Sequence, residues 1–155
     1  MTRVALPFEQ LVPGVRFESE ARVITEADVV RFADVTGDHN PLHIDADWAA
    51  ASPFGERIAH GMLVLSAAIG QLGFDPVQVL ALRRVRDATF KRPVRLGDTI
   101  TVQATVDEAR PFDDRAGLVT FALRVVNQRG ELVCRAAVEA LWRRERSRER
   151  ERARC

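Results

Sequence analysis

Three stretches in the second half of the chain alternate between apolar and polar residues. The apolar side chains fall on even positions in 100–106, on odd positions in 118–126 and on even positions again in 132–142. A period of two places successive side chains on opposite faces of a strand, so each stretch predicts a strand with one buried face. Segments with turn residues separate them, a loop at 110–117 and a tight turn at 127–130. We therefore expect an antiparallel meander with one apolar face.

A fourth segment predicts what covers that face. Residues 61–72 read GMLVLSAAIGQL and are apolar on nearly every side. A helix that is hydrophobic all round is typical of a buried helix, so we expect this one to lie at the centre of the fold, under the meander. The apolar runs of the chain are shorter than the roughly 20 residues that span a bilayer, so we expect no membrane segment.

The remaining segments complete an α+β architecture. Residues 15–24 and 82–90 predict two further strands, and Pro93 and Gly97 predict a bend after the second. A helix is expected from a capping box formed by Thr25 and Asp28 up to Gly37, and a short one near residues 45–51. We expect a single domain over 1–142, an antiparallel sheet of about five strands curled around the long central helix. A sheet this small encloses no deep pocket alone and leaves edge strands open, so we also expect a homodimer joined edge to edge.

Charge and cysteine content limit the classes of partner. The formal net charge is +1, and residues 143–154 hold seven Arg and three Glu, a local excess of +4. This tail, 143–155, alternates the two signs and has no aromatic residue for base stacking, so it predicts a frayed or disordered end and no nucleic acid partner. The N-terminus lacks the apolar core of a secretory signal, and two cysteines as far apart as Cys134 and Cys155 predict no disulfide framework. The expected compartment is the cytoplasm.

One turn gathers the residues suited to proton transfer. The chain has three histidines, and all of them lie in two neighbouring segments: His39 and His43 in GDHNPLHID at 37–45, and His60 in ERIAHGML at 56–63. Asp38 and His43 are five positions apart in a turn of Gly, Asn and Pro, and a carboxylate with an imidazole is well suited to general acid–base chemistry near neutral pH. We take this turn as the candidate active site.

The start of the apolar helix is a second candidate element. The first amide N–H groups of a helix have no partner within the helix and attract negative charge, and Gly61 would let a ligand oxygen approach them closely.

Simpler interpretations exist for each candidate. An isolated GDxNP segment is more often turn chemistry than a catalytic site. His39 and His43 have the spacing of a helical metal pair, but Pro41 between them disfavours a helix, so we expect no metal. His60 fits a structural or pocket-lining imidazole better than a base.

The longer pattern around this turn resembles a known family. The run FADVTGDHNPLHIDADWAA, residues 32–50, is similar to the signature of the MaoC-like dehydratases, the R-specific enoyl-CoA hydratases also called hydratase 2, which have the hot dog fold. The later IAHGML and FKRPVRLGDT, at 58–63 and 90–99, are similar to the family in the same order. The resemblance covers most of residues 15–142, and a motif of this length is far more specific than one acid–base pair.

The resemblance implies an activity and assigns roles. It implies reversible syn addition of water to a trans-2-enoyl thioester, giving the R-3-hydroxyacyl thioester, without cofactor or metal. It implies that Asp38 and His43 hold and activate the water, that Asn40 helps to position them, and that the Gly61 amide stabilises the thioester oxygen. The alternatives are a 3-hydroxyacyl-acyl-carrier-protein dehydratase, a non-catalytic hot dog subunit and a hot dog thioesterase.

The thioester carrier stays open at this point. Coenzyme A and an acyl carrier protein both present phosphate or acidic groups, and the basic side chains that could meet them are Arg83, Arg84, Arg86, Lys91 and Arg92. The same side chains could equally form a solvated face.

Overall fold

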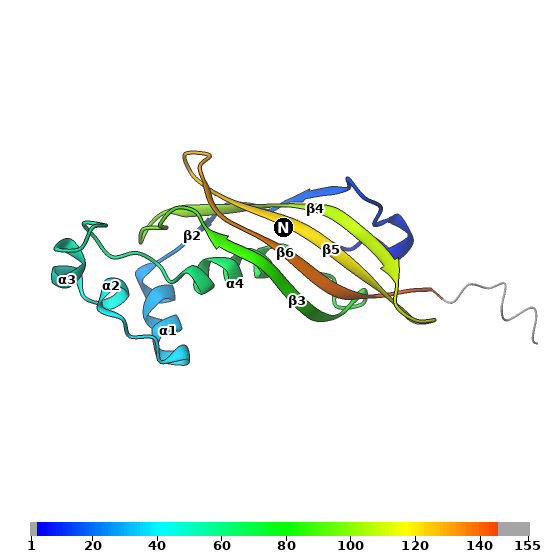
Figure 1. Ribbon diagram of the computed structural model, residues 1–155, viewed down its shortest axis with the longest axis horizontal. Helices are drawn as coiled ribbons and strands as arrows, with labels where there is room; N and C mark the ends of the chain where they lie inside the picture. The colour runs from blue at the N-terminus through cyan, green and yellow to red at the C-terminus, as the bar shows by residue number, and fades with distance from the viewer. Residues whose placement is uncertain (1–2, 146–155) are drawn as a thin grey trace, which may run out of the picture.

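A computed structural model describes residues 3–145 as one sheet with its α-helices gathered at one end and along one face (Figure 1). In chain order the elements are η1 (Phe8–Gln10), β1 (Arg16–Glu18), β2 (Arg22–Val23), α1 (Glu26–Thr36), α2 (Pro41–Ile44), α3 (Ala46–Ala50), α4 (Gly61–Gln71), β3 (Val79–Phe90), β4 (Thr99–Pro111), β5 (Ala116–Asn127) and β6 (Leu132–Arg143). The sheet has six strands in the order β1-β4-β5-β6-β3, with β2 also paired to β4. Every pairing is antiparallel.

The predicted meander is confirmed, and its strands are longer than predicted. β4 pairs with β5 and β5 with β6, and the side chains predicted to be apolar on β4 and β5, from Ile100 to Val125, are buried. The predicted loop at 110–117 shrinks to 112–115 because Asp113 organises a tight turn, accepting hydrogen bonds from the Arg115 and Ala116 amides. These two main-chain hydrogen bonds lower the pKa of Asp113, so the carboxylate stays charged in the turn.

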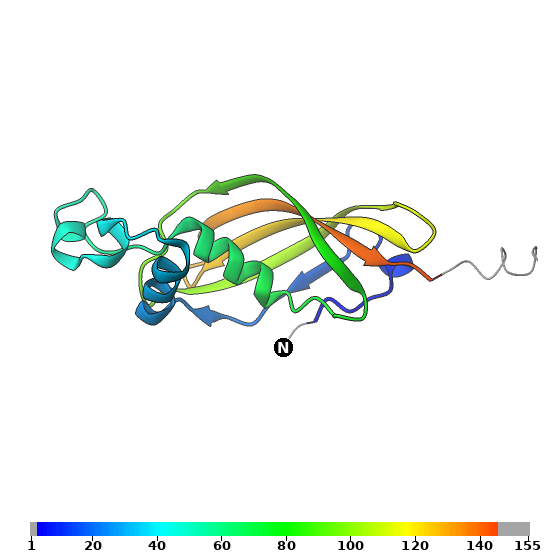
Figure 2. The same ribbon diagram turned by 90° about the horizontal axis from the view of Figure 1, so that it is seen from below.

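Helix α4 lies along one face of this sheet, as expected (Figure 2). Its residues Leu63–Leu65, Ala67 and Ala68 are buried, and they join a core that includes Phe121 and Trp142. The helix is not covered all round, however. Met62, Ser66 and Gly70 are exposed, and because they are four residues apart they form one open stripe. The prediction of a fully buried helix was wrong on that side, since a single sheet covers only part of a helix surface.

The capping box predicted at the start of α1 is present. Thr25 Oγ1 accepts a hydrogen bond from the Asp28 amide, and Asp28 Oδ2 accepts one from the Thr25 amide. The hydrogen bond from the Thr25 amide lowers the pKa of Asp28. At the other end of the helix, Gly37 adopts a φ of +77° and its amide donates to Ala33 O at 2.8 Å. The helix therefore starts and stops where the sequence signals predicted.

Residues 15–24 form two short strands instead of the single strand predicted. Glu18 pairs with Gln103 and Arg22 with Ile100. An advance of four residues along this segment therefore corresponds to an advance of three residues along β4. Ser19 takes up the extra residue: its amide donates to Val102 O, and its hydroxyl accepts from the Val102 amide at 3.0 Å. This bulge is why the sheet has six strands where about five were expected.

Strand β3 is an edge strand. It pairs with β6 alone, through three register shifts, and nearly all of its residues are exposed. This position explains why its sequence, with Arg83, Arg84 and Arg86, alternates so poorly. The observed architecture is the α+β hot dog arrangement that the resemblance implied.

The ends of the chain bear on two other predictions. Strand β6 includes Arg143, and the part of the predicted tail from residue 146 to residue 155 lies outside the described residues. Within residues 3–145, no helix is long and apolar enough to cross a membrane.

Candidate active site

The Asp38 turn is fixed by local hydrogen bonds at the end of α1. Thr36 Oγ1 donates to Phe32 O at 2.6 Å and accepts from the Asp38 amide at 3.2 Å. The Asp38 carboxylate in turn accepts a hydrogen bond from the Asn40 amide at 3.3 Å. Asp38 itself is exposed in the single chain. These contacts set the direction of the side chain although no neighbouring element buries it.

His43 lies on α2, a single helical turn where the sequence predicted an irregular turn. Pro41 occupies a first-turn position, where a missing amide hydrogen costs nothing, and Asn40 Oδ1 caps the helix by accepting from the Leu42 amide at 3.0 Å. His39 lies before this helix, so His39 and His43 do not form the helical pair considered above.

One ring nitrogen of His43 is committed to the main chain. His43 Nδ1 lies 2.7 Å from Ile58 O. A carbonyl oxygen only accepts hydrogen bonds, so Nδ1 carries the proton and Nε2 carries the lone pair. The imidazole is therefore held in the tautomer that can take a proton at Nε2.

Arg57 ties α2 to α1, and sequence reasoning missed it. Its side chain is mostly buried; Nε donates to His43 O at 2.7 Å, while Nη1 contacts Glu26 Oε1 at 2.6 Å. The two partners lie 14 and 31 residues away along the chain, so no local sequence signal indicates the bridge. It holds the main chain of His43 against the start of α1.

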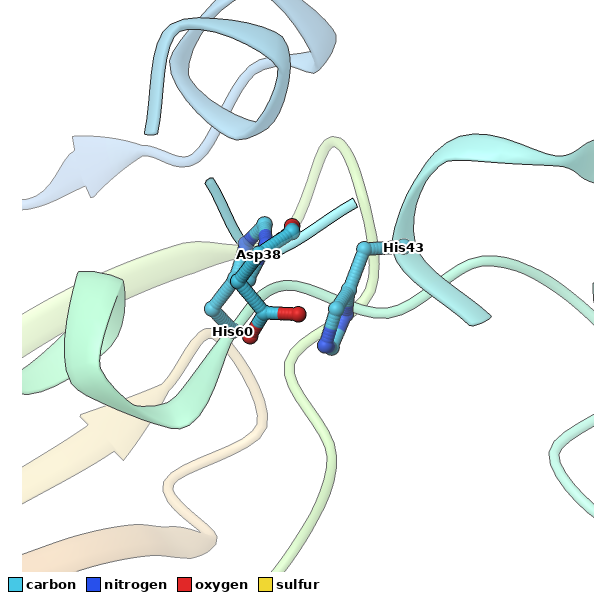
Figure 3. A group of neighbouring side chains, drawn as sticks. All are labelled: Asp38, His43 and His60. Carbon is cyan, nitrogen blue, oxygen red and sulfur yellow. The ribbon is translucent and has the colours of Figure 1, made fainter. Parts of the chain in front are cut away.

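Asp38, His43 and His60 come together, as Figure 3 shows. Donor atoms of the three side chains lie within 4.8 Å of one another. The rings of His43 and His60 are stacked, with centroids 3.8 Å apart and planes at 28°. The predicted pairing of Asp38 with His43 is thus present, and His60, which the sequence assigned a structural or pocket-lining part, touches both members of the pair.

Such a group of donors invites comparison with a metal site. Imidazole lone pairs lie in the ring plane, so those of two stacked rings lie in separate planes tilted by only 28°, whereas one ion bound by both rings needs them to meet at a point. His43 Nδ1 is also occupied by Ile58 O. The arrangement favours a hydrogen-bonded acid–base group over a metal centre.

A pocket of about 290 Å³ opens beside this group. It is lined by His43, Phe54, Ile58, Ala59, Gly61, Val64, Phe90, Lys91, Arg92, Pro93, Val94 and Val133. Two predicted site residues, His43 and Gly61, therefore share one cavity. The other two are not among the lining residues: the Asp38 carboxylate lies within 4.8 Å of ring nitrogens of His43 and His60, and the side-chain oxygen of Asn40 caps α2.

Gly61, the first residue of α4, places the N-terminus of this helix at the pocket. The preceding residue, His60, forms no side-chain capping hydrogen bond, so the first amides of the helix are not satisfied by a cap. The ring of Phe90 lies directly over Gly61, only 2.9 Å from where a Cβ would be. A side chain at position 61 would make the Phe90 ring or the start of the helix shift.

The site thus combines three chemical capabilities. His43 Nε2 can take a proton, Asp38 can hold a polar group beside it, and the positive end of a helix can stabilise an oxyanion a short way along the same cavity.

Comparison with known proteins identifies the family. Residues 9–127 match the family model described as MaoC like domain. Over 116 residues the chain is 40% identical to a 3-hydroxybutyryl-CoA dehydratase of Methylorubrum extorquens, covering 73% of this chain and 71% of the relative. It is also 40% identical to Protein MaoC of Klebsiella aerogenes, of which it spans only about a third, 34%.

Solved structures give the same result. A protein from Archaeoglobus described as a monoamine oxidase regulatory protein matches with a TM-score of 0.85 and 41% identity, over 94% of this chain and 99% of that one. An R-hydratase from Pseudomonas aeruginosa matches with a TM-score of 0.74 and 37% identity, over 90% and 86%. With its fold, its motif and more than half its length matched, this chain belongs to the MaoC-like dehydratase family.

Proposed function

We propose that this protein is a hydro-lyase that adds water reversibly to trans-2-enoyl thioesters and forms R-3-hydroxyacyl thioesters. One observation carries the proposal: His43, with its Nε2 lone pair free and Asp38 beside it, shares a single pocket with the head of α4 at Gly61. Hydration of an enoyl thioester needs these two functions, a proton carrier at the double bond and a donor at the thioester oxygen, a few ångströms apart.

The geometry supports a simple sequence of proton movements. Water held by Asp38 and His43 attacks C3 of the enoyl group while His43 Nε2 takes one of its protons. The electrons of the C2=C3 bond move towards the thioester oxygen, where the Gly61 amide stabilises the negative charge. The imidazolium of His43 then returns a proton to C2, and Asp38 stabilises that imidazolium. One group serves both proton transfers, so hydroxyl and hydrogen are added to the same face.

The relatives support the substrate class. One is named for dehydration of 3-hydroxybutyryl-CoA and another as an R-hydratase. They are the basis for proposing an acyl thioester substrate and the R configuration of the product. Because such substrates are carried by coenzyme A or a carrier protein, we also propose that the protein acts in the cytoplasm. A 3-hydroxyacyl-acyl-carrier-protein dehydratase remains the alternative with the same chemistry.

Hydration of crotonyl-CoA tests the proposal. The purified protein should convert the enoyl thioester to 3-hydroxybutyryl-CoA that is oxidised by an R-specific, and not by an S-specific, 3-hydroxyacyl-CoA dehydrogenase. A thiol reagent in a parallel sample should detect no free coenzyme A. Release of coenzyme A would identify a thioesterase instead. If neither the CoA nor the carrier-protein thioester were converted, the protein would be a non-catalytic hot dog subunit.

Lys91 and Arg92 are proposed to hold the phosphates of coenzyme A. Both line the pocket and are exposed, and among residues 3–145 no carboxylate forms an ion pair with Lys91. Replacing either with Glu should raise KM for crotonyl-CoA about tenfold, the loss expected for one charge-assisted contact, with kcat little changed. Steady-state kinetics at low salt measures this effect.

Two controls make that prediction specific. Arg16→Glu makes the same change at an exposed residue of β1, outside the pocket lining, and should leave KM unchanged. Crotonyl-pantetheine lacks the nucleotide phosphates, so Lys91→Glu and wild type should have equal KM for it. An equal loss with both substrates would place Lys91 against the acyl or pantetheine part and contradict the phosphate assignment.

We also propose that the working form is a homodimer joined through β3. This edge strand leaves Leu80, Leu82, Val85 and Phe90 between 41% and 51% exposed, and a long open strand edge with exposed apolar side chains is a site for pairing with another chain. The 17.3 kDa chain should sediment at twice that mass, 34.6 kDa, and Val85→Asp should shift it towards the monomer. A wild-type monomer at micromolar concentration would contradict the dimer.

A further inference from the structure

We infer that His60 is a positioning residue. It holds Asp38 and His43, the acid–base pair, in a fixed position relative to the N-terminus of α4. The inference rests on the proposed function and extends it to a residue outside the acid–base pair. His60 is 3% exposed, and its ring reaches the Asp38 turn on one hand and the His43 ring on the other.

The contact with Asp38 is a hydrogen bond to its main chain. His60 Nε2 lies 3.0 Å from Asp38 O, and since a carbonyl oxygen only accepts, Nε2 is the protonated nitrogen. The turn that carries the Asp38 carboxylate is otherwise held by contacts within residues 32–40. His60 therefore adds a hydrogen bond from a buried residue to Asp38 itself, beside the contacts that residues 57 and 58 make further along the turn.

The contact with His43 fixes the plane of its ring. The two imidazoles stack at 3.8 Å between centroids, and the His60 ring also packs against Phe32 at 4.9 Å with planes at 55°. Hydrogen bonding to Ile58 O holds one edge of the His43 ring but leaves it free to tilt. Stacking on His60, which is itself packed against α1, opposes that tilt and keeps Nε2 directed at the same point.

The residue gives up other interactions in this position. As the residue preceding α4 it occupies a place where Ser, Thr, Asp or Asn would cap the helix, yet it makes no capping hydrogen bond. Its Nδ1 is buried without a partner among the described residues. Among the described residues, the ring's one hydrogen bond is the one to Asp38 O, so that contact and the ring stacking set its place in the fold.

His60 also connects the pair to Gly61 directly. Its carbonyl accepts the first α4 hydrogen bond, from the Val64 amide at 3.2 Å, so its main chain is part of the helix. Because the ring is held by Asp38 O and the His43 ring, the residue joins that pair to the main chain next to the Gly61 amide. One residue thus sets the spacing between the proton carrier and the oxyanion donor.

Two variants separate the contributions. His60→Phe keeps a ring for stacking but loses the hydrogen bond to Asp38 O, while His60→Gln keeps an N–H donor but loses the ring. We expect His60→Phe to lower kcat for crotonyl-CoA about 100-fold, the effect of roughly 1 Å of misplacement, with KM within about twofold. The kcat of His60→Gln should lie between those of His60→Phe and the wild type. His39→Phe makes the same replacement at an exposed histidine of the turn and should match wild type.

Hydrogen exchange gives a readout independent of activity. Peptides covering residues 37–45 should take up deuterium faster in His60→Phe, while peptides of β4–β6 keep wild-type uptake. Wild-type kcat, or a lowered kcat with unchanged uptake at 37–45, would overturn the inference. Faster uptake throughout the sheet would show a purely structural role and overturn it as well.

The remaining variants keep the test decisive. Should His60→Phe fail to fold, His60→Gln carries the test: uptake at 37–45 near wild type with a reduced kcat supports the inference, and an unchanged kcat overturns it. If Asp38→Asn were as active as wild type, the proposed function itself would fail, and the exchange result at 37–45 would still report on the contact between His60 and the turn.

Discussion

Asp38→Asn and His43→Ala should each reduce hydration of crotonyl-CoA by about 10³-fold, within the range that a positioned general acid or base contributes. Asparagine has the shape of aspartate and keeps an oxygen for the Asn40 amide, so the turn persists while the negative charge is lost. His43→Ala removes the imidazole that lines the pocket and carries the proton. The initial rate of loss of enoyl absorbance measures both effects.

Two neighbouring residues provide matched controls. Asp34→Asn makes the same acid-to-amide change at an exposed position of α1, and His39→Ala makes the same truncation at an exposed histidine. Both should keep wild-type rates. Should Asp38→Asn and His43→Ala turn over as fast as their controls, the acid–base assignment would have to be withdrawn.

Gly61→Ala should lower kcat/KM about 100-fold, because a donor displaced from a developing oxyanion loses most of its effect. The new methyl group would lie 2.9 Å from two atoms of the Phe90 ring, a distance at which the ring or the helix start must move. Alanine is otherwise the better helix former, so the loss should appear in kinetics with little loss of stability. Kinetics with crotonyl-CoA and thermal unfolding measure the two quantities.

The same helix holds the control for this substitution. A Cβ at Gly70 meets nothing within 4 Å, so Gly70→Ala should leave the kinetics unchanged. Combining Gly61→Ala with Phe90→Ala removes the obstructing ring, and the double variant should recover at least about tenfold over Gly61→Ala alone if crowding is the cause. Wild-type kcat/KM in Gly61→Ala would contradict the role given to the head of α4.

The sequence predicted those parts of the fold in which local pattern and tertiary packing agree. The meander strands alternate because one face packs on α4, and α1 starts and stops at residues that satisfy its terminal groups. The split of residues 15–24 was not predictable, because it depends on Ser19 bonding to Val102, 83 residues away. The open stripe of α4 was missed for a similar reason: composition shows that a helix is apolar, but only the tertiary structure shows which side the sheet leaves uncovered.

The candidate site divides in the same way. Asp38, His43 and Gly61 were proposed from their residue types and motif, and the structure places His43 and Gly61 in one pocket, with a carboxylate oxygen of Asp38 within 4.8 Å of a His43 ring nitrogen. His60 and Arg57 act through contacts with residues 14 to 31 positions away, so their parts in the site appear only once the chain is folded. Asn40 was expected to help position the acid–base pair, and the structure has one contact suited to that role: its side-chain oxygen caps the helix that carries His43.

A crystal structure of Asp38→Asn with R-3-hydroxybutyryl-CoA bound would show the proposed site at work. The thioester oxygen should lie within hydrogen-bond distance of the Gly61 amide, and the 3-hydroxyl group should lie between the substituted amide at position 38 and His43 Nε2. A ligand whose thioester lies away from the head of α4, or whose hydroxyl group faces neither side chain, would contradict the proposed chemistry.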